Sequence, residues 1–264
     1  MSTGGPGGAD IATRELLGIE FALTDYDGTL ARIEEMLAGD KRGYLCCTSV
    51  HGLMESRRDP ELAAALDGAT LNLPDGMPVV WALNLLSERK PLRDRVYGPT
   101  LMERACDRAA AAGTGVYLYG GHDEGALREL KTGLRRRAPA IDIAGDFSPP
   151  HRDLSADEER EVAQRIDESG AGIVWCGVST PRQEKWVARM RPLVKAPVLI
   201  SVGAAFDFLA GRVSQAPSWM QRRGLEWAYR LGREPRRLGP RYLRSNPAFV
   251  AAVVRQYRRE RGQR

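Results

Sequence analysis

The sequence has no uninterrupted apolar run of about 18 residues, so no segment is expected to cross a membrane as a helix. Its first ten residues are rich in glycine and have no apolar core, which excludes a secretory signal and predicts disorder. Only four cysteines occur, and none has the Cys-x-x-Cys or Cys/His spacing of a metal site. Three of them lie in apolar stretches, where cysteine is most often a small core residue. These absences predict a protein of the reducing cytoplasm.

Charges of the two signs nearly cancel through most of the chain, but not at its C-terminal end. Residues 230–264 contain eleven arginines against two glutamates, a net charge of +9, which leaves −4 for the residues before Arg230. A basic end on a slightly acidic body predicts an anionic partner. Three candidates remain open on charge alone: a phospholipid surface, a nucleic acid and a diphosphate-bearing substrate.

Short apolar runs alternate with helical patterns of about 10–15 residues, which predicts an α/β fold with a mostly parallel, Rossmann-like sheet flanked by helices. The predicted strands are 19–23, 44–52 with a polar turn at its end, 70–73, 115–121, 140–145, 172–178 and 198–202. We expect three parts along the chain. These are a disordered N-terminus (1–14), an α/β domain (15–224) and a basic C-terminal helical appendage (225–264).

Residues 71–81 read as a short strand, a turn and the start of a helix. Pro74 ends the strand, and Gly76 and Pro78 shape the turn, so Asp75 is expected at the carboxyl end of the strand. Ligands of open α/β sheets bind at that end, where a carboxylate can act as a general base. Capping of the following helix is the alternative role for Asp75, and its position leaves both open.

Polar residues and glycines also follow other predicted strands. Thr48 and His51 stand where a strand passes into a helix, and backbone N–H groups at a helix start can hold a phosphate. A single histidine in such a place is more often structural than catalytic. Gly120 and Gly121 end a clear strand in the manner of a nucleotide-binding turn, although no Gly-x-Gly-x-x-Gly motif is present.

Two further segments contribute candidate ligand-binding residues. Arg182, Gln183 and Glu184 open a helix directly after a buried strand, where their polar side chains are poor core material. Asp207 is the one carboxylate in a segment of small and aromatic residues after the last strand.

An Asp-x-Asp-Gly-Thr segment near the N-terminus supports a different enzyme class. Asp25 and Asp27 match the nucleophile and the acid/base of haloacid-dehalogenase-type phosphatases, and the triplet also looks like a metal site of sugar-nucleotide enzymes. A turn is the structural alternative, because Asp and Gly are common turn residues. The later lysine and acidic pair that such a phosphatase needs are not found in convincing form.

Taken together, these segments resemble the WecG/TagA/CpsF glycosyltransferases between Thr48 and about Phe249. The resemblance rests on many short pieces that occur in order at the family's spacing. They are Thr48 to Gly52, Asp75 to Val80, Arg95 to Gly98, Ser148 to Pro150, Gly177 with Pro181 to Glu184, Val202 to Asp207, Ala216-Pro217, Gly224 to Trp227, Arg230-Leu231 and Glu234 to Arg237.

The resemblance implies transfer of a hexose or N-acetylhexosamine from a UDP-sugar to a polyprenyl-diphosphate-linked sugar, in bacterial surface or exopolysaccharide biosynthesis. It implies that Asp75 is the general base and that Thr48, Arg95 and Gln183 line the pocket, where we expect Thr48 to be a second catalytic residue. Arginines like Arg230 and Arg237 are expected to reach a diphosphate.

The chain also departs from the family pattern in two places. Arg182 replaces the usual lysine, and Val50 with His51 replaces an asparagine-containing turn. The second departure resembles the exopolysaccharide branch and argues against N-acetylmannosamine as the donor sugar.

The arginine-rich end leads to the remaining expectations. Arginines can stabilise a departing diphosphate, and no carboxylate pair demands a metal, so we expect no metal cofactor. A single displacement with one base implies inversion at the anomeric carbon. Arginines beside Trp227, Tyr229, Tyr242, Phe249 and Tyr257 suit an anionic lipid surface, which predicts a peripheral protein at the inner face of the cell membrane. A nucleic-acid-binding module is the non-enzymatic alternative, but no known motif supports it, so nucleic acid is not expected as a partner. A homo-oligomer is left open.

Overall fold

The computed structural model describes residues 11–89 and 91–263, and the side chains of Ser218, Arg222, Arg237 and Arg241 lie outside this description. Residues 1–10 of the predicted disordered N-terminus also lie outside the described residues. The first strand, β1 (Thr13–Leu16), begins two positions before residue 15, where we expected the α/β domain to start.

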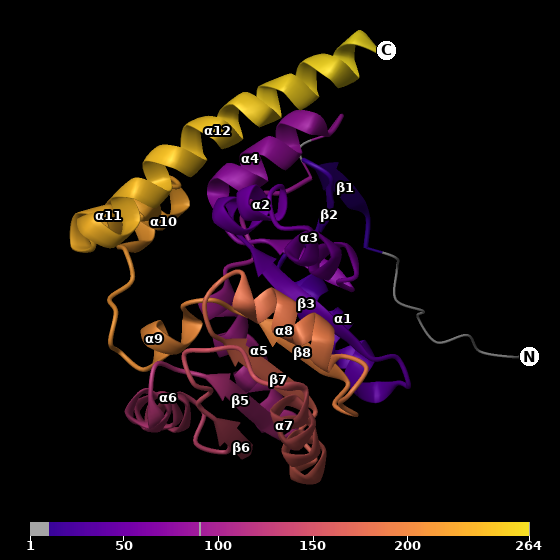
Figure 1. The fold of residues 1–264 in the computed structure, drawn as a ribbon, viewed down its shortest axis with the longest axis vertical. Coiled ribbons are helices and arrows are strands. Elements are labelled where there is room, and N and C mark those ends of the chain that lie inside the picture. The colour runs from indigo at the N-terminus through magenta and orange to yellow at the C-terminus, as the bar shows by residue number, and fades with distance from the viewer. Residues whose placement is uncertain (1–10, 90, 264) are drawn as a thin grey trace, which may run out of the picture.

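A six-stranded parallel sheet forms the centre of the molecule, which confirms the predicted Rossmann-like α/β fold (Figure 1). Its strand order is β4-β3-β8-β7-β5-β6. The strands are β3 (Gly43–Thr48), β4 (Leu71–Pro74), β5 (Val116–Gly120), β6 (Ile143–Phe147), β7 (Ile173–Gly177) and β8 (Val198–Ser201). Because all six run in one direction, the residues that follow each strand meet at the same edge of the sheet.

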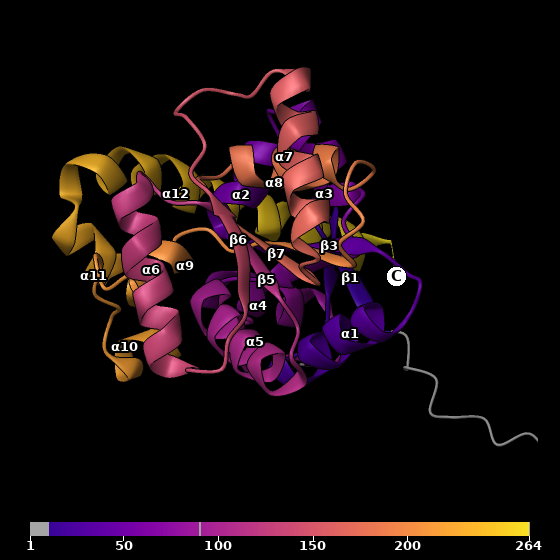
Figure 2. The same ribbon diagram turned by 90° about the horizontal axis from the view of Figure 1, so that it is seen from below.

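Helices cover both faces of this sheet (Figure 2). They are α1 (Tyr26–Ala38), α2 (Val50–Ser56), α3 (Pro60–Asp67), α4 (Met77–Leu86), α5 (Gly98–Ala112), α6 (Glu124–Arg137), α7 (Ala156–Ser169) and α8 (Arg182–Met190). Successive residues of a strand point to opposite faces, so each strand serves two cores. In β7, Val174 and Cys176 pack with α3, α7 and α8, while Ile173 and Trp175 pack with α1, α5 and α6.

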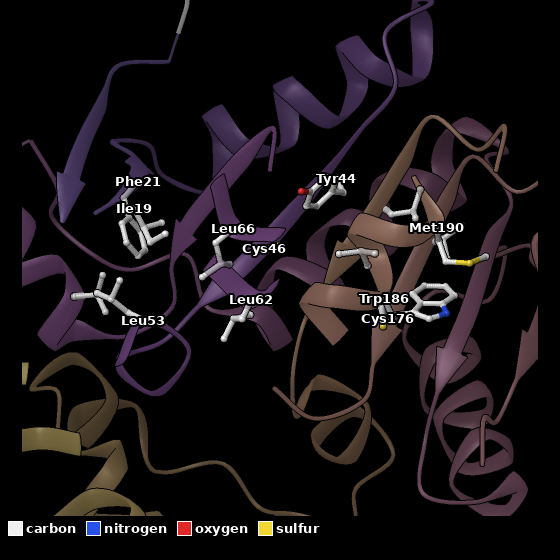
Figure 3. Packing of buried hydrophobic residues seen from close by; sticks show 14 of the residues in the cluster. Ile19, Phe21, Tyr44, Cys46, Leu53, Leu62, Leu66, Cys176, Trp186 and Met190 are labelled. Carbon is white, nitrogen blue, oxygen red and sulfur yellow. The ribbon is translucent and has the colours of Figure 1, made fainter. Parts of the chain in front are cut away.

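Figure 3 shows the first of these cores from close by, with Tyr44 and Cys46 of β3 near Leu62 and Leu66 of α3. Elsewhere in this core, the ring of Trp186 on α8 stacks on that of Tyr119 on β5 with 3.6 Å between centroids. All four cysteines are free and buried, which confirms the core position predicted for three of them and extends it to the fourth.

An antiparallel hairpin of β1 and β2 (Ile19–Ala22) precedes the sheet. Leu16 and Phe21 are fully buried and join the same core as α4. The hairpin therefore extends the core rather than forming a free N-terminal arm.

The C-terminal part consists of α9 (Ala205–Leu209), α10 (Ser218–Arg222), α11 (Glu226–Arg233) and α12 (Pro235–Gly262). Helix α12 runs along α2 and α4 to the hairpin, as Figure 1 shows in yellow. Its residues Phe249 and Val253 are buried in the core, and Gln256 accepts a hydrogen bond from the Leu17 N–H at 2.9 Å. Within the described parts of the chain, no helix combines the length and hydropathy that a bilayer crossing requires.

Candidate active site

Asp75 follows β4 directly, at the carboxyl edge of the sheet. Its backbone N–H donates to the Thr48 carbonyl at 3.1 Å, so the residues after β3 and β4 are held together. Gly76, at φ +155°, occupies the N-cap position of α4, and no side chain caps that helix. The Asp75 carboxylate instead accepts a hydrogen bond from the N–H of Gly98, the first residue of α5, at 3.2 Å. Asp75 therefore does not cap the helix that follows it.

The loop before α5 brings two large side chains to Asp75. The Val96 N–H donates to the Pro74 carbonyl at 3.0 Å, which fixes this loop against the end of β4. The buried guanidinium of Arg95 then lies over the ring of Tyr97, 4.0 Å from its centroid. Arg95 thus lies near enough for its charge to act on the Asp75 carboxyl group, and its predicted place in a substrate pocket stays a prediction.

A buried carboxylate from α11 completes this group. Glu226 is 7% exposed and accepts a hydrogen bond from Arg95 Nη2 at 2.5 Å and another from the Tyr97 hydroxyl at 2.8 Å. Gln221 of α10 accepts from the same Arg95 nitrogen at 3.2 Å. Burial raises the pKa of Tyr97 far above its ordinary value, with Glu226 adding to the effect, so the hydroxyl stays protonated and donates.

The surroundings of Asp75 raise the pKa of its carboxyl group to about 7. Burial is the largest cause, because a low-dielectric site disfavours the charged form, and the negative charge of Glu226 acts in the same direction. Arg95, the Gly98 N–H and Arg230 oppose the rise. A carboxyl group with such a pKa is about half ionised at neutral pH and can accept a proton there.

Arg230 comes from the same helix as Glu226. Its guanidinium lies 5.8 Å from the ring centroid of Phe208, and this ring lies 6.2 Å from that of Tyr97. Helix α11 therefore brings one acidic and one basic side chain to the site of Asp75. Arg237 belongs to α12, and its side chain lies outside the described residues, so its predicted diphosphate contact stays a prediction.

Gln183 and Glu184 lie at the start of α8 and are almost completely buried, although their sequence suggested poor core material. The Gln183 carbonyl oxygen accepts from the Gly203 N–H at 2.9 Å, and its amide donates to Glu184 at 2.8 Å. Glu184 also accepts from the Thr180 hydroxyl at 2.9 Å. These contacts tie α8 to the segment after β8.

Arg182 is the residue of this helix that points outward to a loop. Its guanidinium donates to the carbonyls of Pro150 and Arg152 at 3.2 and 2.6 Å and pairs with Asp153 at 3.3 Å. It therefore fixes the loop between β6 and α7 in this structure. A substrate contact of Arg182 stays a prediction.

Gly120, Gly121 and Asp207 gather at the ends of β5 and β8. Gly120 has φ +144°, and a Cβ atom there would stand 2.5 Å from the Gly177 carbonyl oxygen, so only glycine fits. His122, the next residue after this turn, pairs with Asp207 at 3.5 Å. The substrate contacts expected of Gly120, Gly121 and Asp207 stay predictions.

Thr48 and His51 flank the turn between β3 and α2. Thr48 is buried, and its hydroxyl donates to the Cys46 carbonyl at 3.4 Å, while His51 lies in the first turn of α2. Their predicted catalytic and substrate-binding roles stay predictions.

The aspartates of the phosphatase alternative have local partners. Asp25 is the N-cap of α1 and accepts from the Gly28 N–H at 3.0 Å, and Asp27 pairs with Arg108 at 3.6 Å. They follow the hairpin rather than a strand of the parallel sheet. Across the described part of the chain, no group of three or more His, Cys, Asp or Glu side chains is placed to hold a metal ion.

Tyr97 and Glu226 were not among the residues singled out from the sequence as site residues. Both lie inside segments that carry the family resemblance, and that position was the only available signal. Tyr97 and Glu226 lie far apart in sequence, so no local pattern indicates the hydrogen bond between them.

Comparison with known proteins adds an independent line of evidence. The model of the "Glycosyl transferase WecG/TagA/CpsF family" matches residues 14–263. A curated protein of Bacillus spizizenii (strain ATCC 23059 / NRRL B-14472 / W23) is 30% identical over 247 residues, which cover 93% of this chain and 92% of the relative. That protein is described as an N-acetylglucosaminyldiphosphoundecaprenol N-acetyl-beta-D-mannosaminyltransferase.

Proposed function

The chain belongs to the WecG/TagA/CpsF glycosyltransferase family, and we propose that it transfers a hexose or N-acetylhexosamine from a UDP-sugar to a polyprenyl-diphosphate-linked sugar. The observation that supports this most directly is the place of Asp75, at the carboxyl edge of the sheet with Arg95 and Arg230 near it, where a pKa of about 7 suits its carboxyl group to act as a general base. The relative's acceptor is a lipid-linked sugar diphosphate, which supports an acceptor of the same class here. The pathway proposed is bacterial surface or exopolysaccharide biosynthesis.

In the proposed mechanism, Asp75 takes the proton from a hydroxyl group of the acceptor sugar. The hydroxyl oxygen forms a bond to the anomeric carbon of the donor as the bond from that carbon to the diphosphate breaks. The nucleoside diphosphate leaves with the electron pair. One displacement of this kind inverts the anomeric configuration.

Positive charge near Asp75 supports the departure of this leaving group. Arg95 and Arg230 both lie close enough to lower the pKa of Asp75, and cationic groups stabilise charge that grows in a transition state. We therefore propose that the arginines supply this stabilisation and that no metal cofactor is needed.

The test is turnover with a panel of UDP-sugars, including UDP-glucose, UDP-galactose, UDP-N-acetylglucosamine and UDP-N-acetylmannosamine, on a lipid-linked sugar diphosphate. We expect one donor to be used in EDTA, with inversion seen by proton NMR of the product. Asp75→Asn should lower kcat by about 10²–10⁴-fold, because the base is lost. The matched control is Asp25→Asn, which keeps a good N-cap residue and should leave kcat unchanged. Full activity of Asp75→Asn would contradict the proposal.

The C-terminal helices support a peripheral membrane position. Exposed apolar side chains on α10, α11 and α12 lie among the arginines of this end, namely Trp219, Trp227, Leu243, Val250 and Val254. We propose that this surface, here called the C-terminal apolar surface, docks on an anionic lipid leaflet at the inner face of the cell membrane. Phe249 takes no part, since it is buried.

A further inference from the structure

Arg95 lies between two carboxylates that compete for it. Glu226 holds it directly, with Nη2 of Arg95 at 2.5 Å from Oε2. Among the described residues, Asp75 makes no ion pair within 4 Å and has only the Gly98 N–H as a hydrogen-bond donor. The guanidinium is nevertheless close enough to be the largest favourable charge acting on Asp75.

Four contacts hold Arg95 against Glu226 rather than against Asp75. Besides Arg95, Glu226 accepts from the Tyr97 hydroxyl at 2.8 Å, which orients its carboxylate. Tyr97 also lies under the guanidinium at 4.0 Å, and Gln221 accepts a further hydrogen bond from Arg95 at 3.2 Å. Arg95 and Glu226 are 8% and 7% exposed, so water competes little for either. The arrangement holds Arg95 on the α11 side of the site.

We propose that Glu226 is a positioning residue that keeps Arg95 away from Asp75, so that the Asp75 carboxylate stays unpaired and able to accept a proton. The inference rests on the proposed function, in which Asp75 is the base. A carboxylate locked to a guanidinium is a weaker base, because pairing stabilises its ionised form. Removing the Glu226 charge should let Arg95 turn to Asp75 and pair with it.

Other charged or titratable groups also act around Asp75, and they stay in place when Glu226 is changed. They are Arg95, Tyr97 and Arg230, together with the buried thiol of Cys47 on β3, whose pKa is raised by burial and then by Asp75. A change seen on altering Glu226 can therefore be assigned to the Glu226 charge and to the position of Arg95.

The first experiment is the pH profile of kcat/KM for Glu226→Gln, with the UDP-sugar that the panel identifies. The acid limb should move by about one pH unit toward lower pH, and the plateau should fall by about tenfold, since the base is weaker and Arg95 is misplaced. The control is Glu260→Gln, which removes a carboxylate that ties α12 to Arg14 far from Asp75. This variant should keep the wild-type limb. A Glu226→Gln limb at the wild-type position would overturn the proposal.

The second experiment needs no substrate. The unfolding free energy is measured against pH for wild type, Asp75→Asn, Glu226→Gln and the double variant. The difference between the proteins with and without Asp75→Asn, taken once with Glu226 and once with Glu226→Gln, isolates the titration of Asp75. The midpoint of this titration in the folded protein should lie about one pH unit lower in the Glu226→Gln background than in the wild-type background. An unchanged midpoint would refute the role of Glu226.

Failure of the inference and failure of the proposed function can be told apart. If Asp75→Asn is inactive and the acid limb of the Glu226→Gln pH profile stays at the wild-type position, only the role of Glu226 is rejected. An active Asp75→Asn rejects Asp75 as the base. If Glu226→Gln does not fold, Glu226→Asp decides. Its shorter side chain draws back from Arg95, so a smaller downward move of the limb supports the proposal and an unmoved limb overturns it.

Discussion

Asp75 is the most unusual single residue of this protein, because the fold brings the pKa of its carboxyl group close to neutral pH. Its pKa of about 7 lies well above the unfolded value of about 3.9, because burial disfavours the charged form. The folded state therefore binds more protons than the unfolded state between these two pH values. The stability that Asp75 contributes is fully present below about pH 4 and is lost as the pH rises through about 7.

Asp75→Asn should therefore become more stable relative to wild type as the pH rises from about 4 to about 8. The difference in unfolding free energy should grow by at most about 4 kcal/mol, since one pKa unit corresponds to about 1.4 kcal/mol. Urea unfolding at a series of pH values measures it. A difference that does not vary with pH would show that Asp75 titrates normally.

Gly120 ends β5 at the carboxyl edge of the sheet, where its backbone packs closely against Gly177. Gly120→Ala should lower the unfolding free energy by about 2–4 kcal/mol, because the new Cβ would meet the Gly177 carbonyl oxygen at 2.5 Å and φ is +144°. Gly113→Ala is the matched control. Gly113 also has a positive φ of +66° but has nothing within 4 Å, so about 1 kcal/mol is expected. Equal losses, measured by chemical denaturation, would contradict the steric argument.

At the scale of elements, the far end of α12 fastens the N-terminal hairpin. Gln256 bonds to the Leu17 N–H at 2.9 Å and to the Glu15 carbonyl at 3.3 Å, and it is buried. Gln256→Ala should cost about 1–3 kcal/mol, because it leaves these backbone groups without partners. Hydrogen exchange should quicken at Leu17 in particular. The exposed neighbour Arg255 is the control, and Arg255→Ala should change neither quantity. Unchanged exchange at Leu17 would show that the hairpin does not need this contact.

Elements with regular apolar patterns were predictable from the sequence, and the others were not. The strand predicted at 198–202, for example, is confirmed as β8. Strand β1 was not predicted, because Thr13, Arg14 and Glu15 carry no apolar pattern and only hairpin pairing makes them a strand. The position of β8 between β3 and β7 depends on tertiary packing alone.

Some residues of the candidate site could likewise be predicted from the sequence, and some of their contacts could not. Asp75 could be singled out because Pro74 and Gly76 mark the end of a strand, and such ends bind ligands. The pairing of Arg95 with Glu226 joins residues far apart in sequence, so no local pattern predicts it. Gln183 and Glu184 looked like poor core material, yet they are buried and bonded to protein groups, because the packing of α8 overrides the polarity of its sequence. Their contact with a ligand stays a prediction.

At the scale of the whole molecule, charge and exposed apolar area coincide at the C-terminal end. The triple change of Leu243, Val250 and Val254 to Glu should abolish sedimentation with anionic liposomes, because it removes apolar area and adds repulsive charge. These side chains are exposed, so the melting temperature should stay within a few degrees of wild type. Truncating α12 would be a poorer test, since Phe249 and Val253 belong to the core.

The matched control is Leu193→Glu, which alters an exposed leucine in the loop after α8. This variant should sediment with liposomes as wild type does. Sedimentation of the triple variant at the wild-type level would remove the membrane role of the C-terminal apolar surface.

The bond between Gln256 and the hairpin also has a consequence for biosynthesis. A ribosome makes β1 and β2 long before α12, so the hairpin lacks this partner until the residues of α12 have emerged. The ion pair of Arg14 with Glu260 also brings the first and last described elements of the chain together. A short peptide could therefore join β1 to the end of α12 in a circular permutant whose new termini lie in a surface loop. In that permutant, α12 and the hairpin would be synthesised one after the other.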